Sequence, residues 1–190
     1  MTASFQLLEP GLAHLPAYTE ALRRGWSPDN TRPEAAAEEL LEIDSDAESF
    51  LASLDDRDAT GAPITLPDGS QVPRLPGYHR WMWDGDFCGE ISFRWQPGTT
   101  ALPPHCLGHV GYSVVPWKRR RRYATRALAL MLEEVALEGL PYVELSTTPD
   151  NTASQRVIEA NGGRMVERFR KLDAHGGAEG LRFRIDVKCR

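Results

Sequence analysis

The fold is decided by one stretch of sequence, residues 108–146, which reads GHVGYSVVPWKRRRRYATRALALMLEEVALEGLPYVELS. Its first part, 108–115, predicts a strand. From 123 to 138 apolar residues recur at spacings of three and four, which predicts a helix with one apolar face, and Gly139 stands where the chain should leave that helix. A second strand is expected at 142–146. Strand, helix and strand in this order predict a βαβ unit with parallel strands.

The sequence that follows predicts a short helix and a hairpin. Asn151 is placed to cap a helix that ends at Asn161-Gly162-Gly163. Residues 164–172 and 181–187 then predict two antiparallel strands joined by a glycine-rich turn.

The sequence that precedes the stretch predicts another hairpin. Residues 78–83 and 87–95 are aromatic and β-branched runs on either side of Asp84-Gly85-Asp86. Residues 55–77 are rich in Pro, Gly and Asp and are expected to form a loop.

The N-terminal part predicts a short strand at 4–8 and helices at 12–24 and 33–54, the second with Thr31 as cap and Pro33 in its first turn. The acidic residues of this second helix either form a solvated face or line an acidic wall beside a cationic substrate. They are Glu34, Glu38, Glu39, Glu42, Asp44, Asp46 and Glu48.

Length and composition limit the classes of protein. The chain has 190 residues, 41% hydrophobic and 26% charged, which fits one globular domain over 1–190 and excludes a disordered chain or a coiled coil. No apolar run approaches the ~20 residues that cross a bilayer, so we expect a cytoplasmic protein without a membrane partner. Three cysteines, odd in number and far apart, predict free thiols, and no histidine has metal-ligand spacing.

Charge is distributed unevenly along the chain. Residues 1–60 carry 13 Asp/Glu and 4 Lys/Arg, whereas residues 61–190 carry 14 and 18. Six of these basic residues fall in 118–126, between the predicted strand and the first turn of the helix. A helix start offers unpaired N–H groups and the positive end of the helix dipole, so this segment favours a phosphate or pyrophosphate ligand. An isoelectric point near 5.6 argues against a general nucleic-acid binder.

The same segment resembles the coenzyme-A-binding signature of GNAT-type N-acetyltransferases, in which Arg or Gln is followed three positions later by Gly and two later again by Gly or Ala. Arg119 and Ala124 match the ends of that signature, and 151–163 resembles the second conserved region of the superfamily. The resemblance runs from about 78 to 187, and weakly through the N-terminal helices. It implies an α/β (α+β) GNAT-like fold: a mixed, mostly antiparallel sheet with a central βαβ unit whose parallel pair splays to admit the coenzyme, and flanking helices.

The resemblance also implies an activity. It is the transfer of an acetyl group from acetyl-CoA to a primary amine of a small molecule or peptide, by a monomer or homodimer in which 1–77 borders the acceptor and 78–187 binds the coenzyme. The residues expected at the coenzyme are Val114, Val115, Arg119, Arg120, Arg121, Arg122, Tyr123, Ala124, Thr125, Asn151 and Ser154. The backbone N–H of Val114 is expected to stabilise the oxyanion of the thioester carbonyl.

Two residues are the candidate catalytic acid and base. Tyr112 shares the face of Val114 by strand alternation and can carry a proton as an acid, whereas His109 points to the opposite face and is expected to be structural. Glu90, on the preceding strand, is the candidate base because it lies in a largely apolar run. By the same alternation it shares a face with Cys88 and Ser92.

Two departures from the superfamily pattern leave alternatives open. Arg122 stands at the central glycine of the signature, and Ile158 stands where many relatives carry a tyrosine that protonates the departing thiolate. Arg122 either adds a guanidinium contact to a phosphate or takes the place of glycine at a steric cost. The alternatives are a catalytically impaired coenzyme-A-binding regulatory protein and a nucleic-acid-associated protein that uses the arginine cluster.

Overall fold

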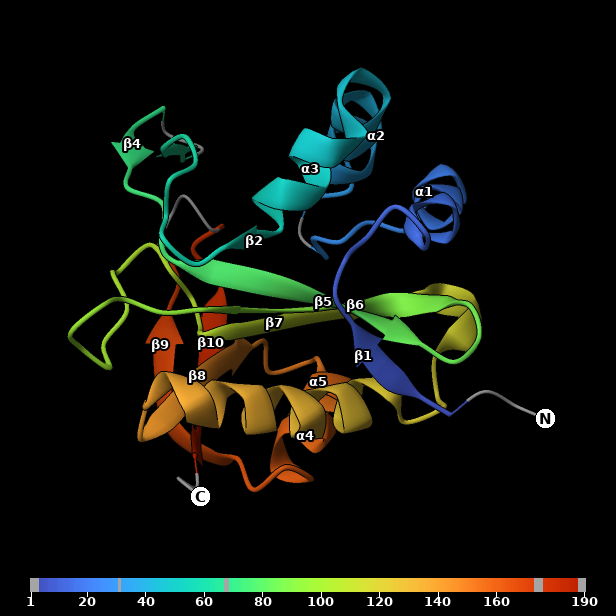
Figure 1. Ribbon diagram of the computed structural model, residues 1–190. Helices are drawn as coiled ribbons and strands as arrows, with labels where there is room; N and C mark the ends of the chain where they lie inside the picture. The colour runs from blue at the N-terminus through green and yellow to red at the C-terminus, as the bar shows by residue number, and fades with distance from the viewer. Residues whose placement is uncertain (1–3, 31, 67–68, 173–175, 188–190) are drawn as a thin grey trace.

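A computed structural model describes residues 4–30, 32–66, 69–172 and 176–187, which form two larger antiparallel sheets with helices packed against them and a separate two-stranded sheet, β3-β4 (Figure 1). The elements in chain order are β1 (Gln6–Leu8), α1 (Leu15–Arg23), α2 (Ala35–Ser45), α3 (Ala47–Ser53), β2 (Asp55–Asp56), β3 (Ile64–Thr65), β4 (Gln71–Val72), β5 (Gly77–Trp83), β6 (Phe87–Arg94), β7 (Val110–Val114), α4 (Tyr123–Val135), β8 (Tyr142–Thr147), α5 (Thr152–Glu159), β9 (Arg164–Arg170) and β10 (Glu179–Asp186).

The first sheet has the order β1-β5-β6-β7, with β2 also paired to β5. Helices α1 to α3 cover one face of it and α4 covers the other (Figure 1), and we call these the α1 face and the α4 face. Side chains alternate between the faces along each strand: Trp81 packs with the α1 helices and Met82 packs with α4. Each face therefore has its own apolar cluster.

A β-bulge interrupts this alternation in β6. The pairing passes from Trp83↔Phe87 to Met82↔Gly89, so Cys88 is an extra residue in its strand. Cys88 packs on the α4 face, whereas Glu90 two residues later lies on the α1 face. The expectation that Glu90 shares a face with Cys88 is therefore wrong, because one inserted residue reverses a period-two pattern.

The second sheet, of order β8-β10-β9, meets the first at one point. The N–H of His109 donates to the carbonyl of Glu144 at 2.7 Å, and an added Cβ on Gly108 would lie 3.0 Å from the same oxygen. In the part of the chain that the structure describes, this is the one backbone hydrogen bond between the β7 and β8 segments. The expected fold is confirmed, and its parallel pair is splayed so far that no ladder forms.

Helix limits differ from expectation in the N-terminal part, where α1 begins at Leu15 rather than at residue 12. The single helix expected over 33–54 is two helices, α2 and α3, because Asp46 is extended (φ −157°, ψ 93°) and its side chain accepts from the N–H of Ser49 to cap α3. Asn151 caps α5 and Gly139 ends the α4 segment with a positive φ, as predicted. Thr31, the expected cap of α2, lies outside the described residues.

The segment expected to be a loop, 55–77, contains the three short strands β2, β3 and β4 and the start of β5. Cys88 and Cys106 are free thiols, and Cys189 lies outside the described residues. None of the described helices is both long and apolar enough to span a membrane. Over the same residues, no three or more His, Cys, Asp or Glu side chains gather as metal ligands.

Candidate active site

The edge of β7 that faces β8 is open. The N–H of Val115 donates to the carbonyl of Cys88 on β6, so odd-numbered residues of this strand direct their backbone groups to β6. The even-numbered Tyr112 and Val114 therefore direct theirs into the splay between the sheets. The N–H of Val114, the expected oxyanion donor, is one of these groups.

Two side chains already bond carbonyls on this edge. Asn30, from the α1–α2 connection, donates through Nδ2 to the carbonyl of Tyr112 at 3.2 Å, and Arg119 donates through Nε to that of Val114 at 3.2 Å. The edge is thus left with N–H groups as its unused polar atoms, which suits a ligand rich in acceptors.

The chain then forms a loop of unpaired N–H groups. Arg120 (φ +62°) and Arg122 (φ +61°) are both left-handed, and the first backbone bond of α4 runs from the N–H of Arg126 to the carbonyl of Arg122. Among the described residues, no backbone acceptor bonds the N–H groups of 120–125. Such a loop, leading into a helix of 13 residues, can hold pyrophosphate oxygens.

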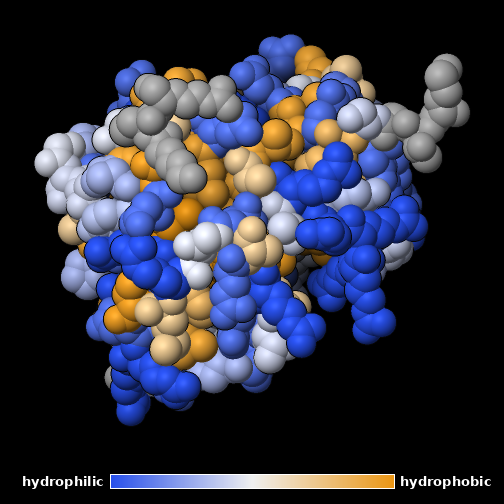
Figure 2. All heavy atoms as spheres, turned by 90° about the horizontal axis from the view of Figure 1, so that it is seen from below, coloured by the Kyte–Doolittle hydropathy of each residue, from blue (hydrophilic) through white to orange (hydrophobic). Residues whose placement is uncertain are grey.

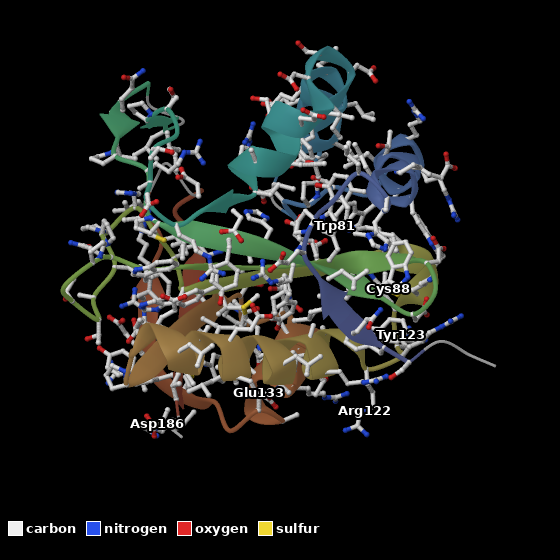
Figure 3. All side chains as sticks on the ribbon, viewed as in Figure 1. Trp81, Cys88, Arg122, Tyr123, Glu133 and Asp186 are labelled. Carbon is white, nitrogen blue, oxygen red and sulfur yellow. The ribbon has the colours of Figure 1, made fainter. Side chains whose placement is uncertain are left out.

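Arg122 keeps the backbone conformation that its glycine counterpart would adopt without strain. Its side chain points away from the start of α4 (Figure 3). Seen from the side of α4 and α5, hydrophilic side chains project from that same edge of the molecule (Figure 2). The guanidinium groups of the loop are therefore at the surface, beside the unpaired N–H groups.

Not every residue of the basic segment is available to a ligand. Lys118 is buried, and its Nζ donates to Asp84 Oδ1 at 2.7 Å. Tyr123 donates its hydroxyl to the other oxygen of Asp84 and stacks on Phe5 (5.0 Å, 14°). Burial opposes ionisation of Asp84, but hydrogen bonds from Lys118 and Tyr123 outweigh it and lower its pKa to about 2. These contacts anchor the loop to the β5–β6 hairpin.

Three of the predicted coenzyme contacts have polar groups that are already bonded within the protein. Val115 is buried, and its N–H bonds Cys88 while its carbonyl accepts from Lys118. Val115 therefore has no free N–H to offer the coenzyme. Tyr123 can offer its backbone N–H, because its phenol is bonded to Asp84. Asn151 uses its side-chain oxygen to accept from the N–H of Ser154 at 3.1 Å.

The α4 face brings Tyr112 and Ser154 together across the splay. Their hydroxyl oxygens are 2.7 Å apart, which joins β7 to the first turn of α5. Burial raises the pKa of Tyr112 to about 12, against a smaller opposite effect of the Ser154 bond. The phenol therefore stays protonated at neutral pH and is suited to act as an acid. Ile158, one turn further along α5, is buried in the core.

Glu90 lies on the other face. It is the cross-strand partner of Ser113, and its side chain is 8% exposed. Oε1 lies 2.8 Å from Nδ1 of His79, and Oε2 is buried with no hydrogen-bond partner among the described residues. The structure does not bring the two predicted catalytic residues, Glu90 and Tyr112, to one face of the sheet.

Glu39 is a functional candidate that sequence reasoning did not separate from its acidic neighbours. Tyr18 donates its hydroxyl to Glu39 Oε2. Burial, and then the charge of Glu90, raise the pKa of Glu39 to about 7. A signal was available: Glu39 lies three residues after Ala36 and four before Ile43, both buried, so it is on the inner side of α2.

The expectation of a structural histidine at His109 fits one ring nitrogen, whereas Nε2 is buried with no hydrogen-bond partner among the described residues. His109 is fully buried, and its Nδ1 accepts from the N–H of Glu144 at 3.0 Å. Burial lowers its pKa, which keeps the ring neutral and able to accept. His109 therefore bonds Glu144 twice, through backbone and side chain, at the point where the sheets converge.

The chain matches a known protein family over most of its length. The family described as an acetyltransferase (GNAT) domain matches residues 12–164 of this chain. The chain belongs to the GNAT acetyltransferase family. The resemblance seen in the coenzyme signature is thus confirmed, and it extends into the N-terminal helices. Comparison with the curated proteins gives no match.

Solved GNAT structures share the fold at low sequence identity. The microcin C7 self-immunity acetyltransferase MccE, solved with acetyl-CoA and AMP, is 11% identical with a TM-score of 0.60, over 96% of this chain and 92% of its own. RimL, a ribosomal L7/L12 alpha-N-protein acetyltransferase solved with coenzyme A, is 12% identical with a TM-score of 0.61, over 98% of this chain and 96% of its own. RimJ of Mycobacterium smegmatis, solved with a CoA-disulfide, is 17% identical with a TM-score of 0.63, over 97% of this chain and 83% of its own.

Two surface depressions lie away from this GNAT site. One, of about 330 Å³, is lined by the β9–β10 hairpin near Phe169, and the other, of about 400 Å³, lies between β1 and α4 near Leu130. Neither includes the open edge of β7 or the loop that follows it.

Proposed function

We propose that this acetyltransferase transfers the acetyl group of acetyl-CoA to a primary amine of a small molecule or peptide. The observation that carries the proposal is the run of unpaired N–H groups over 120–125, directly after the open edge of β7. This arrangement fits a chain of acceptors that ends in a pyrophosphate.

The donor side is assigned residue by residue. The loop N–H groups, with the side chains of Arg119, Arg120 and Arg121, hold the pyrophosphate, and Ser154 borders the pantetheine arm. Acetyl-CoA, when bound, supplies an acetyl group activated as a thioester. The N–H of Val114 stabilises the negative charge that develops on the carbonyl oxygen.

Tyr112 is proposed as the acid. Its proton sits on the phenol oxygen beside Ser154 and passes to the departing thiolate. In this proposal a phenol from β7 takes the role that many relatives give to a tyrosine of α5, at the position of Ile158. The substitution at Ile158 is then no argument for a protein without turnover.

The acceptor is proposed to enter from the α1 face, where residues 1–77 pack on the sheet. RimL is named a ribosomal L7/L12 alpha-N-protein acetyltransferase, and MccE a microcin C7 self-immunity acetyltransferase. We therefore include both peptide and small-molecule amines among the acceptors to be tested.

The test is a donor-binding measurement followed by an amine panel. Calorimetry of the full chain with acetyl-CoA and CoA should show binding, and thiol release should then be followed with spermidine, a lysine peptide, a peptide with a free amino terminus, an aminoglycoside, a neutral amine and aspartate. We expect the cationic amines to give the highest kcat/KM. Absence of acetyl-CoA binding, or binding without transfer to any amine, would overturn the proposal.

A further inference from the structure

Two carboxylates on the α1 face have no role on the donor side. Glu90, on β6, is nearly buried, and one of its oxygens has no partner among the described residues. Glu39, on α2, is half-buried and bonded to Tyr18. A buried carboxylate oxygen without a donor is costly, so Glu90 Oε2 needs a donor that the described residues do not supply.

Contacts connect these two carboxylates through two aromatic rings. The ring of Tyr18, whose hydroxyl bonds Glu39, stacks on Trp81 (4.6 Å, 15°). Trp81 is the cross-strand partner of Glu90, on the same face of the sheet. Burial and then the charge of Glu90 raise the pKa of Tyr18, and Glu90 also acts on Glu39, so the groups lie within electrostatic reach.

The surroundings supply little positive charge. The titratable groups facing Glu39 are Tyr18 from α1, His79 from β5, Glu90 from β6 and Glu42 from its own helix. Over the described part of the chain, no lysine or arginine forms an ion pair with Glu39 or Glu90. A cation entering here would offset two negative charges and satisfy the unpaired oxygen.

We propose that Glu39 and Glu90 bind the ammonium group of the acceptor, with Glu39 as the base that removes its proton. The inference rests on the proposed function and adds the charge class of the acceptor and the identity of the base. Glu90 lies one strand in from the donor edge: its cross-strand partner is Ser113, whose hydroxyl accepts from Trp26 Nε1, and the residue after Ser113 is Val114, the proposed donor to the thioester oxygen.

The proton step is balanced within the site. One N–H bond of the bound ammonium breaks, its electron pair stays on nitrogen, and an O–H bond forms on the Glu39 carboxylate. An amine that titrates at about 10 needs such an acceptor, and a carboxylate titrating near neutrality receives the proton more readily than an ordinary glutamate. Glu90 stays bonded to His79 and holds the nitrogen.

The first experiment needs no turnover. Carbon-13 carboxyl NMR of the full chain, with glutamate labelled, should show Glu39 titrating with a midpoint near 7, which Glu90→Gln should lower by about one pH unit. Saturation with n-butylammonium chloride should lower the wild-type midpoint too, whereas butan-1-ol should leave it unchanged. If Glu90→Gln does not fold, Tyr18→Phe is the second variant: it removes a bond to charged Glu39 and should raise the midpoint.

The second experiment follows kcat/KM against pH with the best amine of the panel. Glu39→Gln should lower kcat/KM about 100-fold at pH 7 and less as the pH approaches 10, where more of the amine is already neutral. Glu90→Gln should mainly raise KM for the amine. The control is Glu38→Gln on the same helix, whose carboxylate forms a surface pair with Arg32 and whose loss should change kcat/KM less than twofold.

The outcomes separate this inference from the proposed function. Transfer with unchanged pH profiles in Glu39→Gln, or a Glu39 midpoint that ignores both Glu90→Gln and n-butylammonium, overturns the inference and leaves the transferase intact. Loss of acetyl-CoA binding in the wild type overturns the function instead. Both Gln variants should bind acetyl-CoA as the wild type does, and a defect there also overturns the assignment of these carboxylates to the acceptor.

Discussion

The two faces of the first sheet carry opposite chemistry although they share the same strands. The α4 face leads to a loop of N–H groups and arginines and holds a phenol that stays protonated, whereas the α1 face holds two carboxylates, one of them titrating near neutrality. Strand β7, at the edge, belongs to both. An edge strand next to a splay can therefore border an anion site on one face of the sheet and a cation site on the other.

The largest effect is expected from removing the bulge that separates the faces. Gly89 has φ +141°, and a Cβ there would lie 2.2 Å from the carbonyl oxygen of Ser113. Gly89→Ala should lower the free energy of unfolding by about 3–5 kcal/mol, measured by denaturant titration. Gly98→Ala is the control, since Gly98 (φ +77°) has no heavy atom within 4 Å of its added Cβ and should cost about 1 kcal/mol.

Equal stability of the two variants would show that the bulge does not depend on glycine. The separation of Cys88 from Glu90 would then need another explanation.

The next effect concerns the acid on the α4 face. Tyr112→Phe should lower kcat about 10- to 100-fold and leave the affinity for acetyl-CoA unchanged, because only the proton donor is lost. Thiol release and calorimetry on the same preparation measure the two quantities. Tyr142→Phe, which removes a phenol bonded to Thr100 outside the site, should keep the wild-type kcat. A Tyr112→Phe enzyme with normal kcat would assign the proton to another donor.

A smaller effect is expected for stability against pH on the α1 face. The pKa of Glu39 is about 7 in the folded chain, against an ordinary 4.5, so the folded state binds a proton that the unfolded state has already lost. Stability should therefore fall, by on the order of 1 kcal/mol, as the pH rises from about 4.5 through 7. The dependence should disappear in Glu39→Gln and persist in Glu38→Gln. Parallel curves for wild type and Glu39→Gln would contradict the raised pKa.

The smallest effect is expected in the loop. Arg122→Gly relieves a left-handed conformation and should raise the free energy of unfolding by about 0.5 kcal/mol. We also expect a few-fold tighter binding of acetyl-CoA, because glycine lets phosphate oxygens approach the backbone. Arg121→Gly is the control for stability alone: Arg121 is not among the residues with positive φ, so glycine there relieves no strain, but its side chain is one of those proposed to hold the pyrophosphate. Weaker binding by Arg122→Gly, most marked at low salt, would show that the guanidinium holds a phosphate.

The order of strands and helices could be predicted because it rests on local patterns. The three- and four-residue spacing of α4, the cap at Asn151 and the turn at Asp84-Gly85-Asp86 are each contained in a few residues. The break at Asp46 was missed because aspartate within an acidic helical stretch gives no warning that it will cap the next helix.

On the donor side the sequence predicts the residues at the coenzyme, because their signature is contiguous. The contact between Tyr112 and Ser154 joins two residues that the sequence named separately, and it was not predicted. The α1 face depends on a bulge at Cys88, which alternation does not reveal, and on which of several glutamates of α2 turns inward. Both are decided by packing between segments far apart in the chain.

The left-handed arginines of the phosphate loop have a consequence for how members of this family are found. A left-handed L-residue costs roughly 1 kcal/mol, which a domain stable by 5–15 kcal/mol tolerates when anchors such as Lys118–Asp84 hold the flanking chain. Glycine in the signature is therefore a preference of the backbone and not a condition for its shape. Pattern searches that demand glycine will pass over chains whose loop has the same conformation, and a search by backbone dihedral angles will retain them.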